Sequence, residues 1–213
     1  MKTNENYLMI YSMTDDTNFA PHVKGGWISL ACCASPVREN AKIGDIILGV
    51  GTKELEEKVG VPNHTIIFLM KVTEEPMKFN EYFNNDKFIG RVDNFYKKKD
   101  GRYTKDRRYV EDRRYIHFHE DEDDTKKSEY VLVSNYFYYF GDYWKKDKNL
   151  SEKGEEFCEE IGFRYTPGGH YKKLPLDDTR VRKLIRFINA NYKPGKIGGP
   201  NELPTGSIDS HCQ

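Results

Sequence analysis

Residues 25–38 read Gly-Gly-Trp-Ile-Ser-Leu-Ala-Cys-Cys-Ala-Ser-Pro-Val-Arg, and residues 42–51 read Lys-Ile-Gly-Asp-Ile-Ile-Leu-Gly-Val-Gly. The apolar runs at residues 27–32 and 46–50 have the length of strands and are bounded by glycine or proline. Between them we expect a loop or short helix that carries Arg38, followed by a Gly-Asp turn. The stretch therefore predicts two core strands joined by a crossing segment.

The flanking sequence predicts further strands. Apolar runs of strand length, rich in β-branched and aromatic side chains, occupy residues 7–11, 65–72, 130–133 and 137–140. Residues 79–83 are expected to form one or two turns of helix. Because strands and helices mix along the chain, the sequence predicts an α+β fold.

The most regular helical pattern lies near the C-terminus. Its apolar positions follow the i, i+3, i+4, i+7 spacing of one buried helix face: Val181, Leu184, Ile185 and Ile188. Asp177 or Asp178 precedes this pattern and is expected to cap the helix by accepting one of its first free N–H groups. We therefore predict an amphipathic helix that starts next to this aspartate pair.

The composition indicates one globular domain. The chain has 213 residues, of which 14 % are aromatic, too many for a disordered chain. We expect a single domain over residues 1–204 and a flexible tail over residues 205–213. Basic and acidic residues number 34 each, so the whole molecule has no net field to attract nucleic acid or an anionic membrane. Recognition by charge must therefore be local.

The sequence predicts a cytoplasmic protein that does not contact a membrane. It has no run of 18 apolar residues, and the polar Asn4 and Glu5 make the first residues unlike a signal peptide. The four cysteines form no Cys-x-x-Cys pair. Cys32 and Cys33 lie in an apolar run, where we expect them to behave as small hydrophobic side chains.

Residues 97–127 separate positive from negative charge. Residues 97–114 hold nine lysines or arginines against four acids, and residues 120–129 hold six acids against two lysines. The basic part has the composition of a loop that grips phosphates. Neutralisation by the acidic part is instead typical of a solvated hairpin or long loop. Both interpretations stay open.

Histidines provide the candidates for chemistry. His170 follows two glycines on a predicted turn, where a neutral imidazole can bind a ligand or act as an acid or base. His117 and His119 precede an acidic run, but no downstream partner completes a metal site. The chain also lacks a phosphate loop, a nucleophile elbow, a deaminase zinc motif and a Rossmann glycine pattern. We predict no metal and no other cofactor, and whether the chain is an enzyme stays open.

Aromatic, basic and glycine-rich positions are expected to form a pocket for a flat polar ligand such as a nucleobase. Trp27 and a ring from Tyr138, Tyr139 or Phe140 would stack on the base. Arg38 and His170 would contact phosphate or base edges. The predicted ligand-binding set is Asn18, Phe19, Pro21, Gly26, Trp27, Arg38, Gly51, Lys53, Tyr138, Tyr139 and His170, with His170 as the candidate catalytic residue.

Several of these positions also have a purely structural interpretation. Trp27 is equally typical of a core position at the start of a strand. Arg38 is suited to an ion pair with Asp45 or Glu39. The loop that carries Phe19 can be a simple surface connection. The alternatives differ in whether the side chains face a ligand or the interior.

The order of motifs resembles the second of the nucleotide-modification-associated domain families, which occur in phage and bacterial gene neighbourhoods concerned with altered DNA bases. The resemblance extends over about residues 7–200, and residues 97–127 look like a charged insertion into the family core. Matching blocks follow one another along the chain at residues 18–21, 30–38, 44–51, 130–141 and 168–170.

The Gly-Asp turn and the strand that follows it are also similar to the barrel core of PUA, ASCH and EVE domains. This similarity implies a mixed, barrel-like sheet with flanking helices. Those domains hold a base or a modified base in a pocket between strands and helices. The likeness concerns the fold and raises an expectation about the ligand only by analogy.

Together these resemblances imply recognition of a nucleotide or modified nucleobase in a DNA-modification or defence context. The expected partner is a nucleotide or a nucleic acid that contains a modified base. The expected location is the cytoplasm of a bacterial cell or a phage-infected host. One alternative is a nucleotide- or base-modifying transferase or hydrolase with His170 as acid or base. Another is a protein-interaction module that uses the charged hairpin.

Overall fold

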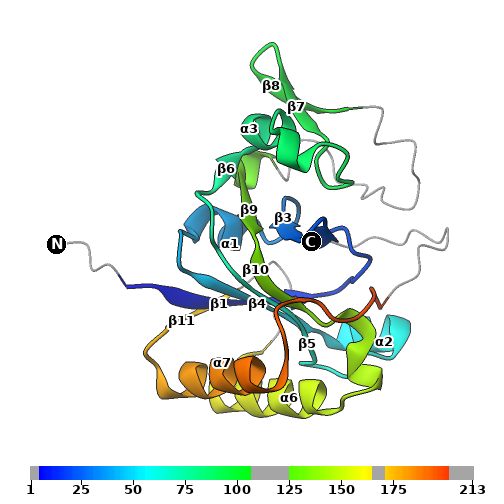
Figure 1. The fold of residues 1–213 in the computed structure, drawn as a ribbon, viewed down its shortest axis with the longest axis vertical. Helices are drawn as coiled ribbons and strands as arrows, with labels where there is room; N and C mark the ends of the chain where they lie inside the picture. The colour runs from blue at the N-terminus through cyan, green and yellow to red at the C-terminus, as the bar shows by residue number, and fades with distance from the viewer. Residues whose placement is uncertain (1–4, 107–124, 165–170, 202–213) are drawn as a thin grey trace.

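The computed structural model describes residues 5–106, 125–164 and 171–201. Its largest sheet has six strands in the order β11-β1-β4-β5-β10-β12. The strands are β1 (Tyr7–Met13), β4 (Ile46–Gly51), β5 (Ile66–Lys71), β10 (Tyr136–Tyr139), β11 (Lys172–Pro175) and β12 (Gly195–Lys196). Two helices, α6 (Asn149–Glu160) and α7 (Thr179–Asn191), cover one face of this sheet (Figure 1). We call this sheet and these two helices the base layer.

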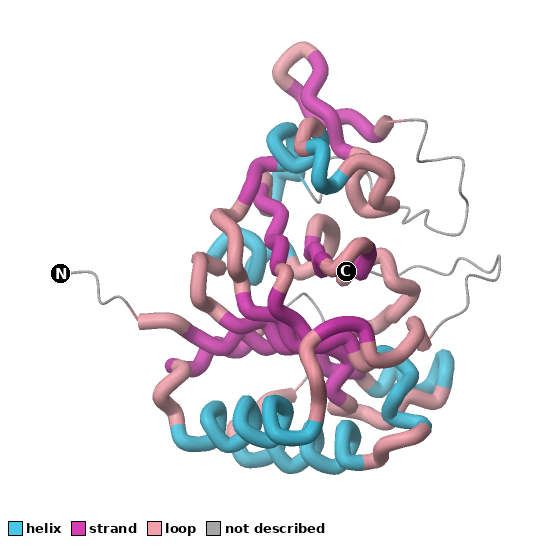
Figure 2. Tube along the Cα trace, viewed as in Figure 1, coloured by secondary structure: helices cyan, strands magenta, loops and turns pink. Residues whose placement is uncertain are grey.

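A second group of elements lies on the opposite side of the sheet (Figure 2). Four of its strands pair in the order β2-β3-β9-β6. They are β2 (His22–Lys24), β3 (Trp27–Leu30), β9 (Tyr130–Ser134) and β6 (Met77–Lys78). Farther from the base layer lie α3 (Phe79–Phe83), the 3-10 helix η1 (Asp86–Phe88) and the paired strands β7 (Tyr96–Lys99) and β8 (Arg102–Lys105). We call these elements the upper lobe.

Three further short elements belong to the described fold. Helix α1 (Ser35–Asn40) connects β3 to β4, and α2 (Lys53–Val59) connects β4 to β5. The 3-10 helix η3 (Gly141–Lys145) follows β10. The connection through the upper lobe and α1 allows β1 and β4 to pair in parallel, whereas β4 and β5 pair antiparallel.

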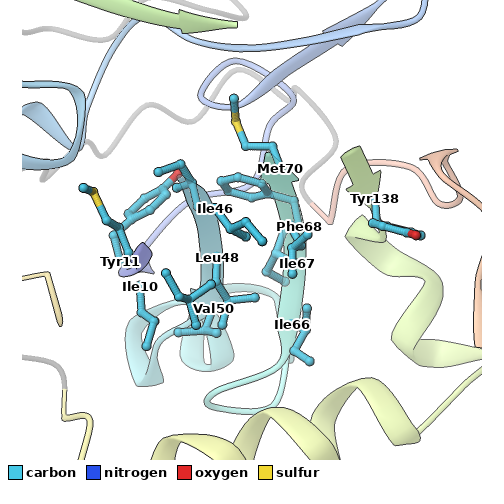
Figure 3. Packing of buried hydrophobic residues seen from close by; sticks show 14 of the residues in the cluster. Ile10, Tyr11, Ile46, Leu48, Val50, Ile66, Ile67, Phe68, Met70 and Tyr138 are labelled. Carbon is cyan, nitrogen blue, oxygen red and sulfur yellow. The ribbon is translucent and has the colours of Figure 1, made fainter. Parts of the chain in front are cut away.

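The central strands are apolar because both of their faces are covered. Strand β4 is buried along its whole length, and only the last residue of β5 is exposed. Side chains from β1, β4 and β5 pack together in Figure 3, with Ile10, Leu48 and Ile67 among them. Gly49 is required in this packing, because a Cβ there would lie 2.2 Å from the Phe68 ring. The predicted core strands are confirmed.

The predicted Gly-Asp turn precedes β4. Gly44 has a φ of 90°, a conformation that glycine adopts without strain. The buried Asp45 carboxylate accepts hydrogen bonds from the backbone N–H of Tyr7 at 2.8 Å and of Lys42 at 3.1 Å. The aspartate therefore ties the start of β1 to the turn that starts β4.

The C-terminal helix is confirmed as α7. Asp178 is its N-cap and accepts from the Arg180 N–H at 2.8 Å. The buried positions are Val181, Leu184 and Ile188, whereas Ile185, which the spacing also places on this face, is only partly buried. Helix α6, which packs beside α7, was not predicted from the sequence. A Cβ on Gly154 of α6 would lie 2.1 Å from the His64 carbonyl oxygen, so glycine allows this helix to approach the loop before β5.

The mixed α+β class is confirmed, but the barrel is not. Among the described residues, β11 and β12 are the two edges of the larger sheet, while β2 and β6 are the edges of the smaller one. The sheets therefore do not close into a barrel, and the PUA-, ASCH- or EVE-like core stays a prediction.

No helix in the described ranges is both long and apolar enough to cross a membrane.

Candidate functional site

Arg38 lies in the interior and binds backbone oxygens of its own chain. Its Nε donates to the Cys33 carbonyl at 2.8 Å, and Nη1 donates to the Ser128 and Tyr130 carbonyls at 3.3 and 2.5 Å. Its guanidinium also lies 5.3 Å from the centre of the Phe79 ring. A buried charge needs such partners, so these contacts explain Arg38 as a clamp between α1 and β9. The guanidinium does not face the surface, as a ligand contact would require.

Tyr138 and Tyr139 are both buried and point to opposite faces of β10. The Tyr138 hydroxyl donates to Asn189 Oδ1 of α7 at 2.7 Å. The Tyr139 hydroxyl donates to Asp16 Oδ1 at 2.6 Å, and burial raises the pKa of Asp16 above its ordinary value. The backbone N–H and side-chain amide of Asn201 also bind this carboxylate. Neither ring lies beside Trp27, which belongs to the other sheet.

The loop between β1 and β2 carries three predicted ligand residues. Phe19 is buried and stacks on Phe95 with ring centres 5.7 Å apart. The Asn18 side chain accepts from the backbone N–H of Val23 at 2.9 Å. Pro21 is buried at the end of this loop. These three residues shape the entry into β2.

The remaining predicted positions lie elsewhere. Gly51 is the buried last residue of β4, and the exposed Lys53 is the first residue of α2. The candidate catalytic His170, together with His117 and His119, lies outside the described residues. The structure therefore separates the predicted set among the base layer, the upper lobe and the interior. Of the predicted positions that the structure describes, Gly26 and Trp27 are the two that stay together at an open surface.

Trp27 and its neighbours form a basic and aromatic surface at the turn between β2 and β3. The Trp27 ring is partly buried and meets the Phe88 ring edge-on, with centres 5.6 Å apart. The exposed Lys87 has its Nζ 5.5 Å from the centre of the Trp27 ring. We call Lys24, Gly25, Gly26, Trp27 and Lys87 the Trp27 platform.

A buried arginine holds this platform from behind. Arg91 Nη1 donates to the Lys24 carbonyl at 2.8 Å, and Nη2 donates to the His22 carbonyl at 2.6 Å and approaches the Trp27 carbonyl at 3.5 Å. In return, Lys24 Nζ donates to the Gly90 carbonyl at 2.7 Å. The β2–β3 turn is thus fastened to residues 88–91 on both sides.

Arg91 belongs to a set of interior polar side chains that we call the buried polar cluster: His22, Ser29, Tyr82, Arg91 and Asp93. The Ser29 hydroxyl donates to Asp93 Oδ2 at 2.5 Å and accepts from Arg91 Nη2 at 2.7 Å. Tyr82 donates to the same carboxylate at 3.1 Å, and Arg91 Nε lies 3.5 Å from Asp93 Oδ1. The Asp93 charge is therefore met by a cation and two hydroxyl donors.

The cluster contains serine, histidine and aspartate, but these residues do not form the hydrogen bonds of a hydrolase triad. A triad needs the serine hydroxyl to donate to the histidine, whereas Ser29 donates to Asp93. His22 Nδ1–H donates to the Asn18 carbonyl at 2.6 Å, and its Nε2 has no hydrogen-bond partner among the described residues. Burial lowers the pKa of His22, so the ring is neutral near pH 7. These side chains support the platform and are closed to substrate.

A groove on the outer side of the base layer is a less suitable site for an anion. It has a volume of about 190 Å³ between α6 and α7. Its rim lysines are already paired, because Lys153 Nζ lies 2.5 Å and Lys183 Nζ 2.7 Å from Glu156. The two lysines lower the pKa of Glu156 to about 2. Both lysines of the groove are therefore neutralised by a carboxylate, which leaves neither of them free to bind an anion.

Sequence reasoning found Trp27 and Gly26 but missed three residues that complete the site. Lys24 had a usable signal, since it stands directly before the glycine pair that leads to the tryptophan. Lys87 and Arg91 had none, because each reaches the turn from 60 or more positions along the chain.

A protein-family model described as nucleotide modification associated domain 2 matches residues 5–206. Neither the curated proteins nor the solved structures contain a significant match.

Proposed function

The chain belongs to the nucleotide modification associated domain 2 family, and from this premise we propose that it recognises a nucleotide or modified base on the Trp27 platform. The observation that carries the proposal is a partly exposed tryptophan, flanked by two lysines, on a turn that a buried arginine fixes. Membership of this family points to a role connected with nucleotide modification. The platform supplies a stacking surface and positive charge.

Stacking competes with the lysine that now lies over the ring. A cation–π contact at an exposed site contributes roughly 0.5–1 kcal/mol, whereas a base stacked on an aromatic ring contributes roughly 1–3 kcal/mol. Lys87 is exposed and flexible, so an incoming base displaces its ammonium at little cost. The displaced ammonium then remains close enough to bind the phosphate of the same nucleotide.

The two glycines let a ligand approach the backbone of the turn. Gly25 and Gly26 have φ values of 61° and 76°, and a Cβ at either position would meet nothing within 4 Å. The space beside the turn is therefore open, and the left-handed conformation favours glycine there. A flat base and its sugar can lie against the turn while Lys24 and Lys87 face the phosphate.

Fixing the turn before binding favours affinity. Ordering a loop on binding costs free energy, and the contacts of Arg91 with three backbone carbonyls remove much of that cost. The same rigidity favours discrimination, because a base with an added group must fit a surface that does not rearrange.

Tryptophan fluorescence tests the proposal. The chain has two tryptophans, so the variant Trp144→Phe leaves Trp27 as the reporter. Titration with nucleoside monophosphates and with short oligonucleotides that carry modified bases should quench its emission. In a separate calorimetric titration, Trp27→Ala should weaken binding about 5- to 150-fold, the equivalent of one lost stacking contact.

Tyr136→Ala is the matched control. Tyr136 is an exposed aromatic residue at 40 % exposure, but it belongs to β10 of the base layer. Its replacement should leave nucleotide affinity unchanged. Equal affinities for wild type, Trp27→Ala and Tyr136→Ala would show that the nucleotide does not bind on the Trp27 platform.

Mass spectrometry of the same incubations distinguishes recognition from catalysis. The binding proposal predicts that every nucleotide is recovered unchanged. A converted product that His170→Ala fails to make would replace this proposal with the enzymatic alternative, in which His170 acts as acid or base.

A further inference from the structure

The β7–β8 ribbon is a two-stranded hairpin at the end of the upper lobe (Figure 1). Asp100 and Gly101 form its turn with φ values of 50° and 80°, the left-handed pair that a tight hairpin requires. Between Tyr96 and Lys105 the ribbon has five basic residues and one acidic residue. It is therefore strongly basic within a molecule whose total charge is zero.

One face of the ribbon packs on the lobe. The Tyr96 and Tyr103 rings lie 4.8 and 5.6 Å from the Phe79 ring, centre to centre. Lys98 pairs with Tyr103 across the strands, and its Nζ lies 5.3 Å from the centre of that ring. This face is thus anchored by aromatic contacts, which fix the direction of the other face.

The opposite face presents cations. Because side chains alternate along a strand, Lys97 and Lys99 share this face with Arg102, which pairs with Lys99. Lys97 is partly neutralised by Asp106 at 3.3 Å. Lys99 and Arg102 are exposed, and neither has an ion-pair partner among the described residues. Lys97 and Lys99 are about 7 Å apart along the strand.

We propose that the ribbon contacts the phosphate backbone of a nucleic-acid strand, so that the ligand of this protein is a polynucleotide and not a free nucleotide. The inference rests on the proposed function, which places a base on the Trp27 platform of the same lobe. Exposed cations on a ribbon that aromatic contacts anchor suit the phosphates of a nucleic-acid strand. A single nucleotide has no phosphate for a second, separate basic surface.

This second surface should add affinity without adding sequence preference. Phosphate contacts release counterions, and each one steepens the fall of affinity with salt by about 0.9 for duplex DNA or about 0.7 for a single strand on logarithmic axes. The base on the platform carries the selectivity. The ribbon and the platform therefore have separable signatures.

The test measures binding of a labelled 12-nucleotide single-stranded DNA, and of its duplex, between 50 and 200 mM KCl. The variant Lys99→Ala/Arg102→Ala removes the two exposed cations of this face, for which no ion-pair partner occurs among the described residues. Its matched control, Arg186→Ala/Lys193→Ala, removes one arginine and one lysine that are exposed on or next to α7. All proteins are also titrated with a nucleoside monophosphate.

The ribbon variant should have a salt slope lower than that of the control by about 1.4 to 1.8. Its loss of DNA affinity relative to the control should therefore shrink about 7- to 12-fold between 50 and 200 mM salt. Its affinity for the monophosphate should equal that of wild type. Equal slopes for the two variants overturn the inference. Equal binding of polyglutamate and DNA to wild type also overturns it, because the surface would then serve an acidic protein segment or any polyanion.

The two proposals fail in different ways. If Trp27→Ala weakens binding of the monophosphate, while the ribbon variant keeps the full salt slope, the platform stands and the ribbon inference is wrong. If the ribbon variant loses its salt slope but Trp27→Ala changes nothing, the ribbon inference stands as phosphate binding and the proposed base contact is wrong.

Discussion

The base layer and the upper lobe are built on different principles. In the base layer, the covered strands are held by apolar packing, and the fully buried Leu48 and Ile67 belong to a cluster that also includes the Phe68 ring. In the upper lobe, an aromatic cluster surrounds a buried ion pair, and Arg91 bonds to backbone carbonyls of a hairpin. Apolar packing tolerates rearrangement, whereas a buried charge network permits one arrangement. The difference indicates that the base layer supplies stability and the upper lobe a surface of fixed shape.

The largest effect is expected from the charge at the centre of the upper lobe. Arg91→Ala leaves the Asp93 carboxylate buried without its cation, which typically costs about 3–5 kcal/mol of unfolding free energy. Urea denaturation of the purified variant measures this loss. Arg182→Ala is the control, because this exposed arginine on α7 should change stability by less than about 0.5 kcal/mol. A similar small change for both variants would mean that the buried pair is not a fixed support.

A core truncation in the base layer should cost nearly as much but spare the lobe. Leu48→Ala removes buried methyl groups and is expected to cost about 2–5 kcal/mol. Denaturation gives the free energy, and hydrogen exchange at the β2–β3 turn gives the local effect. In the folded variant, exchange at this turn should match wild type. Faster exchange there would contradict the division into two differently built regions.

Acid should weaken the upper lobe through His22. The folded-state pKa of His22 lies below its ordinary value of 6.5 because burial disfavours the charged ring. The unfolded chain therefore takes up a proton first, and stability falls as pH drops below about 6.5 and levels off below the folded-state pKa. The slope for one proton is at most about 1.4 kcal/mol per pH unit.

Two histidine variants isolate this effect. His22→Gln should flatten the fall in unfolding free energy between pH 7 and pH 5. His64 also has a lowered pKa but is only about half buried, so His64→Gln should flatten the fall less. An unchanged pH profile in His22→Gln would show that the buried ring does not titrate on unfolding.

The smallest effect is expected at the cap of α7 in the base layer. Asp178→Ala removes the acceptor for the Arg180 N–H and should cost about 1 kcal/mol. Thermal unfolding measures this change. Asp177→Ala is the neighbouring control, since Asp178 and not Asp177 is the cap. A larger loss in the Asp177 variant would reassign the start of the helix.

The base layer was largely predictable because its signals are local. Strand length and apolar composition identified β1, β4 and β5, and the i, i+3, i+4, i+7 spacing identified α7. Helix α6 was missed because Gly154 replaces an apolar residue on its buried face, where it allows close approach to His64. Here tertiary packing, and not helix propensity, favours the residue.

The upper lobe was less predictable because its determinants are distant in sequence. The sequence selected Arg38 as the ligand-binding arginine, whereas its guanidinium binds interior carbonyls. The arginine that organises the candidate site is Arg91, which meets Ser29 across 62 positions. No periodicity or spacing in the sequence indicates that two residues so far apart form a hydrogen bond. The tryptophan could be predicted because its glycine turn is adjacent to it.

Ultraviolet crosslinking, followed by peptide mapping, is the most direct test of base recognition by the Trp27 platform. Wild-type protein is irradiated with a short oligonucleotide that carries a photoreactive base, and the crosslinked peptide is sequenced by mass spectrometry. If the base binds on the Trp27 platform, a crosslink forms within residues 24–27 or at Lys87, is lost in Trp27→Ala and is kept in Tyr136→Ala. A crosslink confined to the base layer, or one that persists unchanged in Trp27→Ala, would contradict the assignment of base recognition to the Trp27 platform.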